Sequence, residues 1–148
     1  MCRQRARPYL FSNTVAPVIV AGALKVLELL SGSTERRDKL EWNARYWRQG
    51  LTAAGLDIKA GESPIVPVML YNAKLAQDVA RDLFAEGIYV VGFFFPVVAK
   101  GLARIRTQLS AAHEKQHLDR GIEAFTKVGK KYGILGKTKQ EIIEQYGL

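Results

Sequence analysis

The sequence predicts an α+β fold in which two front helices precede a small β-α-β-β-α layer, with helices on one face of the sheet. Three observations predict it. Apolar residues recur at helical spacing over 15–30 and again over 40–54. Short β-branched runs begin at Ile65, and a strictly alternating segment begins at Ala103. A length of 148 residues suits one domain, or one domain with a fragment of another.

The front section is expected to hold a short extended run and two helices. The run Pro8–Phe11 is expected to be extended. Side-chain oxygens at Ser12, Asn13 and Thr14 can cap the first helix, and Pro17 fits its first turn. This helix ends at Ser31-Gly32, and the second runs from Ser33 or Thr34 to Gly55. The stretch 57–64 has no periodicity and carries Gly61 and Pro64, so we expect a joint there.

The second section alternates strands and helices. Pro67 inside the first strand favours an edge position, because proline cannot donate to a strand ladder. Asn72 is expected to cap the next helix, and Thr138 with Glu141 matches a capping box. The expected elements are strands at Ile65–Leu70, Ile88–Phe93 and Ala103–Ala112, with helices at Asn72–Glu86, from His113 to Gly133, and after Thr138.

Composition excludes several classes of protein. The chain has one cysteine, so no internal disulfide forms, and no apolar run reaches the length of a membrane helix. The opening residues lack the apolar core of a secretory signal, so an intracellular location is expected. A net charge of +8 suits nucleic acid or a phosphate-bearing small ligand. The basic residues are scattered, however, and two small clusters (Arg3/Arg5/Arg7 and Lys127/Lys130/Lys131 with Lys137/Lys139) fit solvated faces.

The third strand is the strongest candidate for a binding site. Alternation places Arg104 and Arg106 on one face and Ile105 and Thr107 on the other. A guanidinium fork can grip a carboxylate or phosphate through two hydrogen bonds. The alternative is a pair of surface arginines on a solvated sheet face. The apolar segment Phe93–Pro96 just before the strand favours a carboxylate site shielded from water.

Other candidate sites are weaker. His113 and His117 have a spacing that suits a metal, but a third ligand is missing, so capping or surface roles are expected. Ser12 and Asn13 could donate to a phosphate at a helix N-terminus or could simply cap that helix. The Walker and dinucleotide glycine motifs are absent.

Two segments carry a resemblance to a known family. The stretches Arg3-Gln-Arg-Ala-Arg-Pro-Tyr-Leu-Phe-Ser-Asn13 and Gly92-Phe-Phe-Phe-Pro-Val-Val-Ala-Lys-Gly-Leu-Ala-Arg-Ile-Arg-Thr-Gln-Leu-Ser-Ala-Ala-His113 resemble the C-terminal third of the glycine C-acetyltransferases. These are pyridoxal-phosphate (PLP) enzymes of the α-oxoamine synthase family. The resemblance extends in order from Arg3 to about Gly133.

The resemblance implies the C-terminal part of a fold-type I homodimer. Residues 1–55 would be the end of the large domain with its connecting helices, and 56–148 the small C-terminal domain. Arg106 would hold the substrate carboxylate, while Ser12 and Asn13 would reach the PLP phosphate from the neighbouring subunit. The implied reaction condenses glycine with acetyl-CoA to 2-amino-3-oxobutanoate, in the cytoplasm or, for a eukaryotic parent, the mitochondrion. Nucleic acid and membrane would have no part in it.

Some family features are missing or altered. The Schiff-base lysine of the family's Thr-x-x-Lys motif has no counterpart, so the chain alone is expected to be inactive. Phe95, Ala99 and Leu102 stand where Tyr, Pro and a polar residue are usual, which leaves open a 7-keto-8-aminopelargonate synthase type with another acyl donor. A non-enzymatic, basic nucleic-acid-binding α+β module is the alternative from a different class.

Overall fold

The computed structural model describes residues 1–12 and 14–147. It divides into two compact units, Met1–Glu35 and Arg36–Leu148, which are described separately. The predicted domain boundary at residue 55 is a different division, based on the full-length family, and stays a prediction.

The first unit consists of helices: α1 (Cys2–Arg5), α2 (Arg7–Leu10) and α3 (Pro17–Gly32). The expected extended run Pro8–Phe11 is wrong, because Pro8 lies in the first turn of α2, where a missing N–H costs nothing. Pro17 lies in the first turn of α3, as predicted, but the N-cap is Ala16 without a side-chain hydrogen bond, so the capping expected from Ser12 or Thr14 is wrong. None of the described side chains of α3 is buried, and large apolar residues are exposed along it.

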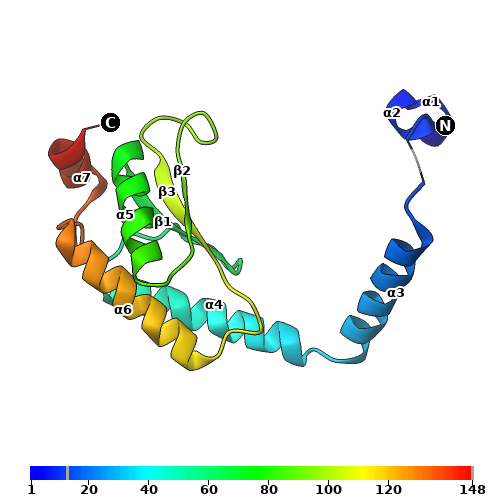
Figure 1. Cartoon of the computed structure of the whole chain (residues 1–148), viewed down its shortest axis with the longest axis horizontal. Helices are drawn as coiled ribbons and strands as arrows, with labels where there is room; N and C mark the ends of the chain where they lie inside the picture. The colour runs from blue at the N-terminus through cyan, green and yellow to red at the C-terminus, as the bar shows by residue number, and fades with distance from the viewer. Residues whose placement is uncertain (13, 148) are drawn as a thin grey trace. The chain divides into compact units, whose positions relative to one another are not determined.

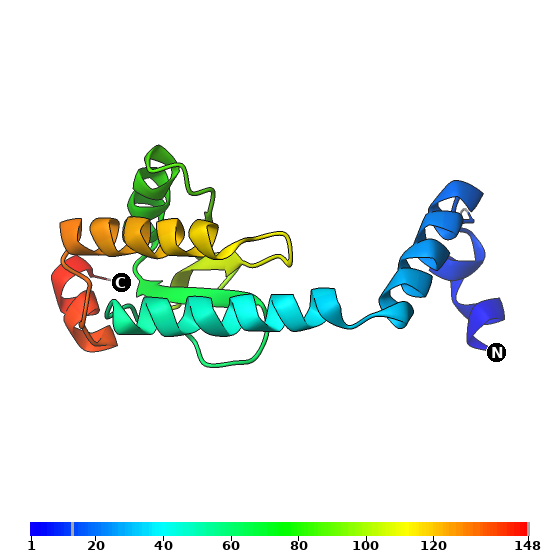
Figure 2. The ribbon, with the colours of Figure 1, turned by 90° about the horizontal axis from the view of Figure 1, so that it is seen from below.

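The second unit contains a three-stranded sheet and four helices (Figures 1 and 2). The strands are antiparallel in the order β1-β3-β2, so β3 is central. β1 is an edge strand, as Pro67 predicts. In chain order the elements are α4 (Glu35–Ala53), β1 (Ile65–Tyr71), α5 (Ala73–Ala85), β2 (Val91–Phe93), β3 (Ala103–Gln108), α6 (Lys115–Lys131) and α7 (Lys139–Tyr146).

The core lies between one face of the sheet and the helices α4, α5 and α6. Val66 of β1 and Ile105 of β3 have no exposed surface, and the same holds for Leu51 of α4 and Leu83 of α5. Burying such side chains stabilises the fold by about 1.5–3 kcal/mol each. Helices α4 and α6 meet through the Trp47 and Phe125 rings, whose centroids are 5.7 Å apart in an edge-to-face arrangement.

Both predicted helix caps in this unit are confirmed. The Asn72 side chain accepts a hydrogen bond from the Leu75 N–H at 2.8 Å. Thr138 and Glu141 form the reciprocal capping box of α7. Local sequence is therefore a sufficient guide to where α5 and α7 begin.

Two strands are shorter than predicted. β2 begins at Val91 rather than Ile88, and β3 ends at Gln108 rather than Ala112. Beyond β3 the chain has other partners, because the Asn43 amide binds the carbonyl oxygens of Ser110 and His113. In the described part of the chain, no single helix is long and apolar enough to cross a membrane; only α3 and α4 taken together across the break between them reach that length and hydropathy.

Candidate functional site

Arg106 lies at the middle of the central strand. It pairs in register with Pro67 of β1 on one side and with Val91 of β2 on the other. Hydrogen-bonded neighbours on both sides fix its backbone more firmly than a loop would. Directly opposed residues share a face of a sheet, so Pro67 and Val91 flank the arginine side chain.

The predicted alternation of β3 is confirmed by burial. Ala103, Ile105 and Thr107 are buried, whereas Arg104 is half-buried and Arg106 and Gln108 are exposed. The two arginines therefore share the sheet face opposite to the helices. Thr107, on the covered face, accepts a hydrogen bond from the Trp47 indole at 3.0 Å and donates to the Val66 carbonyl at 2.7 Å.

An aromatic ring lies beside Arg106. The expectation that this site is shielded from water is wrong for this chain. The Arg106 guanidinium carbon lies 5.8 Å from the centre of the Phe93 ring, within the range of a cation–π contact. Phe95 and Pro96 are exposed instead of forming a wall, and Arg106 itself is exposed. Arg106 and Phe93 line an open cavity of about 480 Å³ that also includes Tyr89 and Ser110.

Of the two residues expected at the cofactor phosphate, Ser12 lies between α2 and α3 in the first unit. The Ser12 hydroxyl is exposed and donates a hydrogen bond to the Tyr9 carbonyl at 2.9 Å. Asn13 lies outside the described residues. The roles of Ser12 and Asn13 at a phosphate therefore stay predictions.

His117 has the capping role that the sequence favours, whereas His113 holds the turn before α6. His113 Nδ1 accepts from the Ser110 N–H, and His117 Nδ1 accepts from the Glu114 N–H at the start of α6. Within residues 1–12 and 14–147, no group of three or more His, Cys, Asp or Glu side chains could hold a metal ion.

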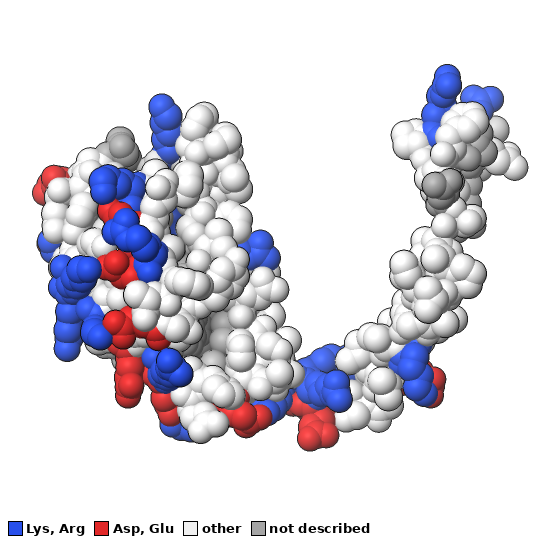
Figure 3. Space-filling model, in the orientation of Figure 1, with Lys and Arg blue, Asp and Glu red and all other residues white. Residues whose placement is uncertain are grey.

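Two of the five lysines in the predicted basic cluster near the end of the chain pair with acidic side chains. Lys131 pairs with Asp82 at 2.6 Å, and Lys127 pairs with Glu86 at 2.7 Å. The hydrogen bond from Lys131 is the main cause that lowers the pKa of the Asp82 carboxyl. Lysine and arginine side chains are interspersed with acidic ones over this unit (Figure 3). Such interspersed charge is unlike the continuous basic surface that binds a phosphate backbone.

Sequence reasoning missed two side chains that hold the segments around the site. Asn43 has no exposed surface, and its amide nitrogen donates to both Ser110 O and His113 O at 2.9 Å. Arg48 donates to the carbonyls of Lys59 and Ser63 at 3.0 and 2.8 Å, and so holds the 57–64 joint against α4. Both residues lie in a helix of ordinary polar pattern, so no local signal separates them from surface residues.

Comparison with known proteins adds a family and several relatives. The family described as aminotransferase class I and II matches residues 1–125. The chain is 54% identical to the 2-amino-3-ketobutyrate coenzyme A ligase of Escherichia coli K12, over 90% of this chain and 33% of that protein. It is 47% identical to the mitochondrial enzyme of that name from Homo sapiens, over 91% of this chain and 32% of the relative. An 8-amino-7-oxononanoate synthase from Thermosipho melanesiensis is 44% identical, with coverages of 90% and 34%.

Solved structures of related enzymes also match this chain. The serine palmitoyltransferase of S. paucimobilis, solved with a bound PLP–myriocin aldimine, matches with a TM-score of 0.84 and 29% identity, over 90% of this chain and 34% of that one. The 8-amino-7-oxononanoate synthase of Francisella tularensis matches with a TM-score of 0.74 and 27% identity, over 89% and 38%. These matches confirm the predicted fold class, the C-terminal portion of fold-type I PLP enzymes. The chain spans about a third of the length of the curated relatives it matches.

Proposed function

The chain belongs to the aminotransferase class I and II family, and we propose that it forms the C-terminal part of a PLP-dependent acyltransferase that condenses glycine with acetyl-CoA to give 2-amino-3-oxobutanoate. One observation carries the proposal: 54% identity to the Escherichia coli ligase over 90% of the chain. The family resemblance of the two quoted segments agrees with it. Homodimerisation and a cytoplasmic or mitochondrial location are parts of the same proposal.

In this function Arg106 binds the carboxylate of glycine. Its place on the central strand fixes the origin of the side chain, and the Phe93 ring limits the directions that the guanidinium can take. A planar fork of two N–H groups matches the two oxygens of a carboxylate. The residue thus orients the amino acid and leaves its α-carbon free to react.

The residues of this chain fit PLP only in part. The exposed Ser12 hydroxyl has the chemistry to hydrogen-bond a phosphate oxygen, and Asn13 is its proposed companion. When bound, PLP supplies an electron sink for the deprotonated carbon of the amino acid. No threonine in the chain is followed three residues later by lysine, so the lysine that would anchor PLP covalently is expected elsewhere in the complete protein.

The chain alone is therefore expected to be inactive. Incubation with PLP followed by borohydride reduction should label no single lysine stoichiometrically, as peptide mass spectrometry would show. Release of coenzyme A from acetyl-CoA should not depend on glycine. A stoichiometric adduct at one lysine, accompanied by turnover, would contradict this part of the proposal.

The role of Arg106 is tested in a complete enzyme. We would join this chain to the upstream two thirds of the Escherichia coli ligase and replace Arg106 with Lys. The glycine KM should rise about tenfold or more, because one ammonium cannot reproduce a bidentate grip. The matched control is Arg104→Lys, two residues away on the same face, which should change the KM by less than about twofold. Equal effects of the two changes, or none, would remove Arg106 from the carboxylate site.

Two other functions remain to be distinguished. The 44% identity to an 8-amino-7-oxononanoate synthase favours a second acyl donor, and comparing acetyl-CoA with a longer acyl-CoA in the joined enzyme decides between them. A nucleic-acid-binding module is the alternative suggested by the net charge of +8, although basic and acidic side chains are interspersed over the second unit (Figure 3). Gel shifts at low and high salt test that module, because phosphate contacts give a steep dependence on salt.

A further inference from the structure

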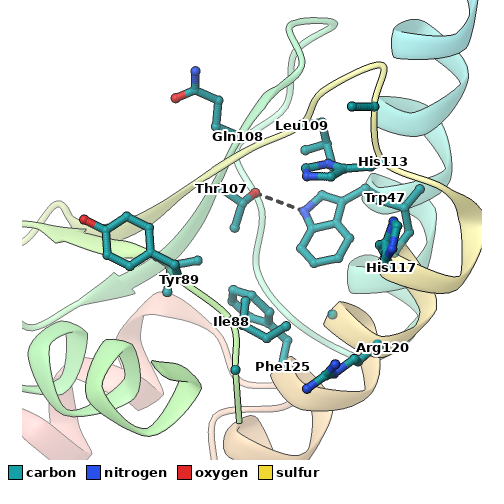
Figure 4. Close-up of a pocket in the computed structure, with 15 residues that line it drawn as sticks. Trp47, Ile88, Tyr89, Thr107, Gln108, Leu109, His113, His117, Arg120 and Phe125 are labelled. Carbon is teal, nitrogen blue, oxygen red and sulfur yellow. Dashed lines mark hydrogen bonds between the residues drawn. The ribbon is translucent and has the colours of Figure 1, made fainter. Parts of the chain in front are cut away.

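A second cavity lies on the covered side of β3 and has no part in the proposed reaction. It has a volume of about 440 Å³, within the range of small-ligand sites. It lies between α4, α6 and the segment that leads into β2 (Figure 4). Thr107 lines it, whereas Arg106 does not. It adjoins the Arg106 cavity, with which it shares five lining residues: Tyr89, Val90, Gln108, Leu109 and His113.

The wall of this cavity is apolar and fixed. Trp47 is only 5% exposed, and the bond from its indole N–H to Thr107 uses its only donor (Figure 4). The Phe125 ring packs edge-on against the indole. Gly121 of α6 allows the Trp47 ring to lie close to this helix, because a Cβ at that position would be 2.7 Å from the ring. The indole therefore presents hydrocarbon to the cavity, held in one orientation.

The polar side chains that line the cavity are Tyr89, Thr107, Gln108, His113, His117 and Arg120. His113 and His117 line the cavity and use Nδ1 to accept backbone N–H groups. Each neutral ring therefore carries its proton on Nε2, so it offers a donor and not an acceptor. Arg120 adds a permanent positive charge. Among the described residues, neither an acidic side chain lining the cavity nor an ion pair to Arg120 is found.

The Arg120 guanidinium lies close to a second glycine. A Cβ at Gly87 would lie 2.9 Å from the Arg120 Nη2 atom, so the guanidinium rests over backbone that carries no side chain. Gly87 also has a φ of +82°, which side chains rarely adopt. Arg120 is exposed, so the cation stands at the solvent edge of the cavity, beside its apolar wall.

We propose that this cavity binds a small monoanion with an apolar body, such as a short-chain carboxylate. The carboxylate lies at the mouth near Arg120 and the histidine Nε2–H groups, and the hydrocarbon lies against Trp47 and Phe125. Apolar walls with a few convergent polar groups are the usual form of a small-ligand site. Because Arg106 takes no part, this inference stands or falls independently of the proposed function.

The two tryptophans of the chain provide a direct test. In ¹H–¹⁵N spectra of the labelled full chain, each gives one indole N–H signal. Trp47 lines the cavity, whereas Trp42 is 45% exposed and stacks on Tyr46 outside it. Titration with hexanoate should shift the Trp47 signal to saturation and leave the Trp42 signal in place. Hexan-1-ol, which has the same body without the charge, should bind at least about fivefold more weakly, since it cannot form the charge-assisted bonds.

Substitutions test the charge. Arg120→Gln should weaken hexanoate binding at least about fivefold, and Arg120→Lys should restore part of it. Arg120 is exposed, so neither replacement should disturb the core. A dispersed Trp47 signal in the same spectrum shows that the variant is folded. The matched control is Arg81→Gln, an exposed arginine of α5 that pairs with Asp78 away from the cavity, which should leave binding unchanged. An unmoved Trp47 signal, equal shifts of both tryptophans, equal binding of the alcohol, or unaltered binding by Arg120→Gln would each overturn the proposal.

Discussion

Two asparagine side chains connect segments that are distant in the sequence. Asn72 caps α5 through its oxygen, while its nitrogen donates to the Tyr146 carbonyl at 2.9 Å near the end of the chain. Asn43 uses its nitrogen for two carbonyls beyond β3. An amide offers donors and an acceptor on one short side chain, so a single residue can join segments that are distant in sequence.

Replacing Asn43 should destabilise the second unit. Asn43→Ala leaves the Ser110 and His113 carbonyls without their donor, which should lower the free energy of unfolding by about 2 kcal/mol or more. Asn43→Asp keeps the shape but has no N–H to donate, so it should cost at least as much. Urea denaturation followed by circular dichroism measures both. Gln49→Ala, at an exposed position of the same helix, is the control and should change stability by less than about 0.5 kcal/mol. Equal losses in all three variants would assign the effect to α4 itself.

Asp82 should contribute to loss of stability in acid. Hydrogen bonds from Lys131 and Tyr132 lower the pKa of its carboxyl below the usual 3.8. The unfolded chain therefore binds the proton more readily, and the stabilisation present above about pH 4 is lost as the pH falls through the folded-state pKa. Asp82→Asn should be less stable than the wild type at neutral pH, with a difference that shrinks below pH 4. Unfolding in urea across this pH range measures it. Glu123→Gln, an exposed residue of α6 outside the ion pairs found, should show no such convergence.

At the scale of elements, the contact between α4 and α6 depends on a small residue. A Cβ at Gly121 would meet two ring atoms of Trp47 at 2.7 and 2.8 Å, and the buried indole has no room to withdraw. Gly121→Ala should therefore cost about 1–3 kcal/mol, despite the better helix propensity of alanine. Thermal denaturation of the second unit measures the loss. Gly22→Ala in α3, where nothing lies within 4 Å of the new Cβ, should leave that transition in place. A neutral Gly121→Ala would show that the helices separate without cost.

The sequence predicts those features of the elements that depend on interactions between residues close in sequence. It does not predict those that depend on distant residues. The caps at Asn72 and Thr138 and the alternation of β3 involve residues within a few positions of each other, and all are confirmed. The end of β3 depends instead on Asn43, whose partners lie 67 and 70 residues away. The extended run expected at Pro8–Phe11 is wrong because proline suits both a loop and the first turn of a helix.

At the scale of the whole molecule, the candidate site shows the same contrast between local features, which the sequence predicts, and the surroundings, which it does not. Alternation alone places Arg104 and Arg106 on one face, and the structure agrees. Shielding from water is a property of everything packed around that face, and in this chain the face is open. The chain spans about a third of its relatives, so the environment that would shield Arg106 is expected in the rest of a complete protein. A motif can thus predict a binding residue, whereas the pocket around that residue depends on parts of the protein that are distant in sequence.

The exposed apolar surface of α3 leads to the last prediction, which concerns the chain as it stands. Leu24 and Leu27 are 62% and 60% exposed, and none of the described side chains of this 16-residue helix is buried. A helix surface with this many large apolar side chains is normally buried, so we expect the chain to self-associate through α3. Sedimentation velocity over a range of concentrations should show reversible oligomers.

Leu24→Gln with Leu27→Gln should raise the dissociation constant at least about tenfold, because each buried leucine contributes about 1.5–3 kcal/mol. The control pair, Lys25→Gln with Glu28→Gln, removes an exposed ion pair from the same helix and leaves its apolar surface intact, so association should persist. A chain that sediments as a monomer throughout would contradict the prediction, as would equal dissociation of the control. Because this surface lies outside the second unit, the Trp47 signal should be the same in both variants, and loss of association would then be assigned to α3.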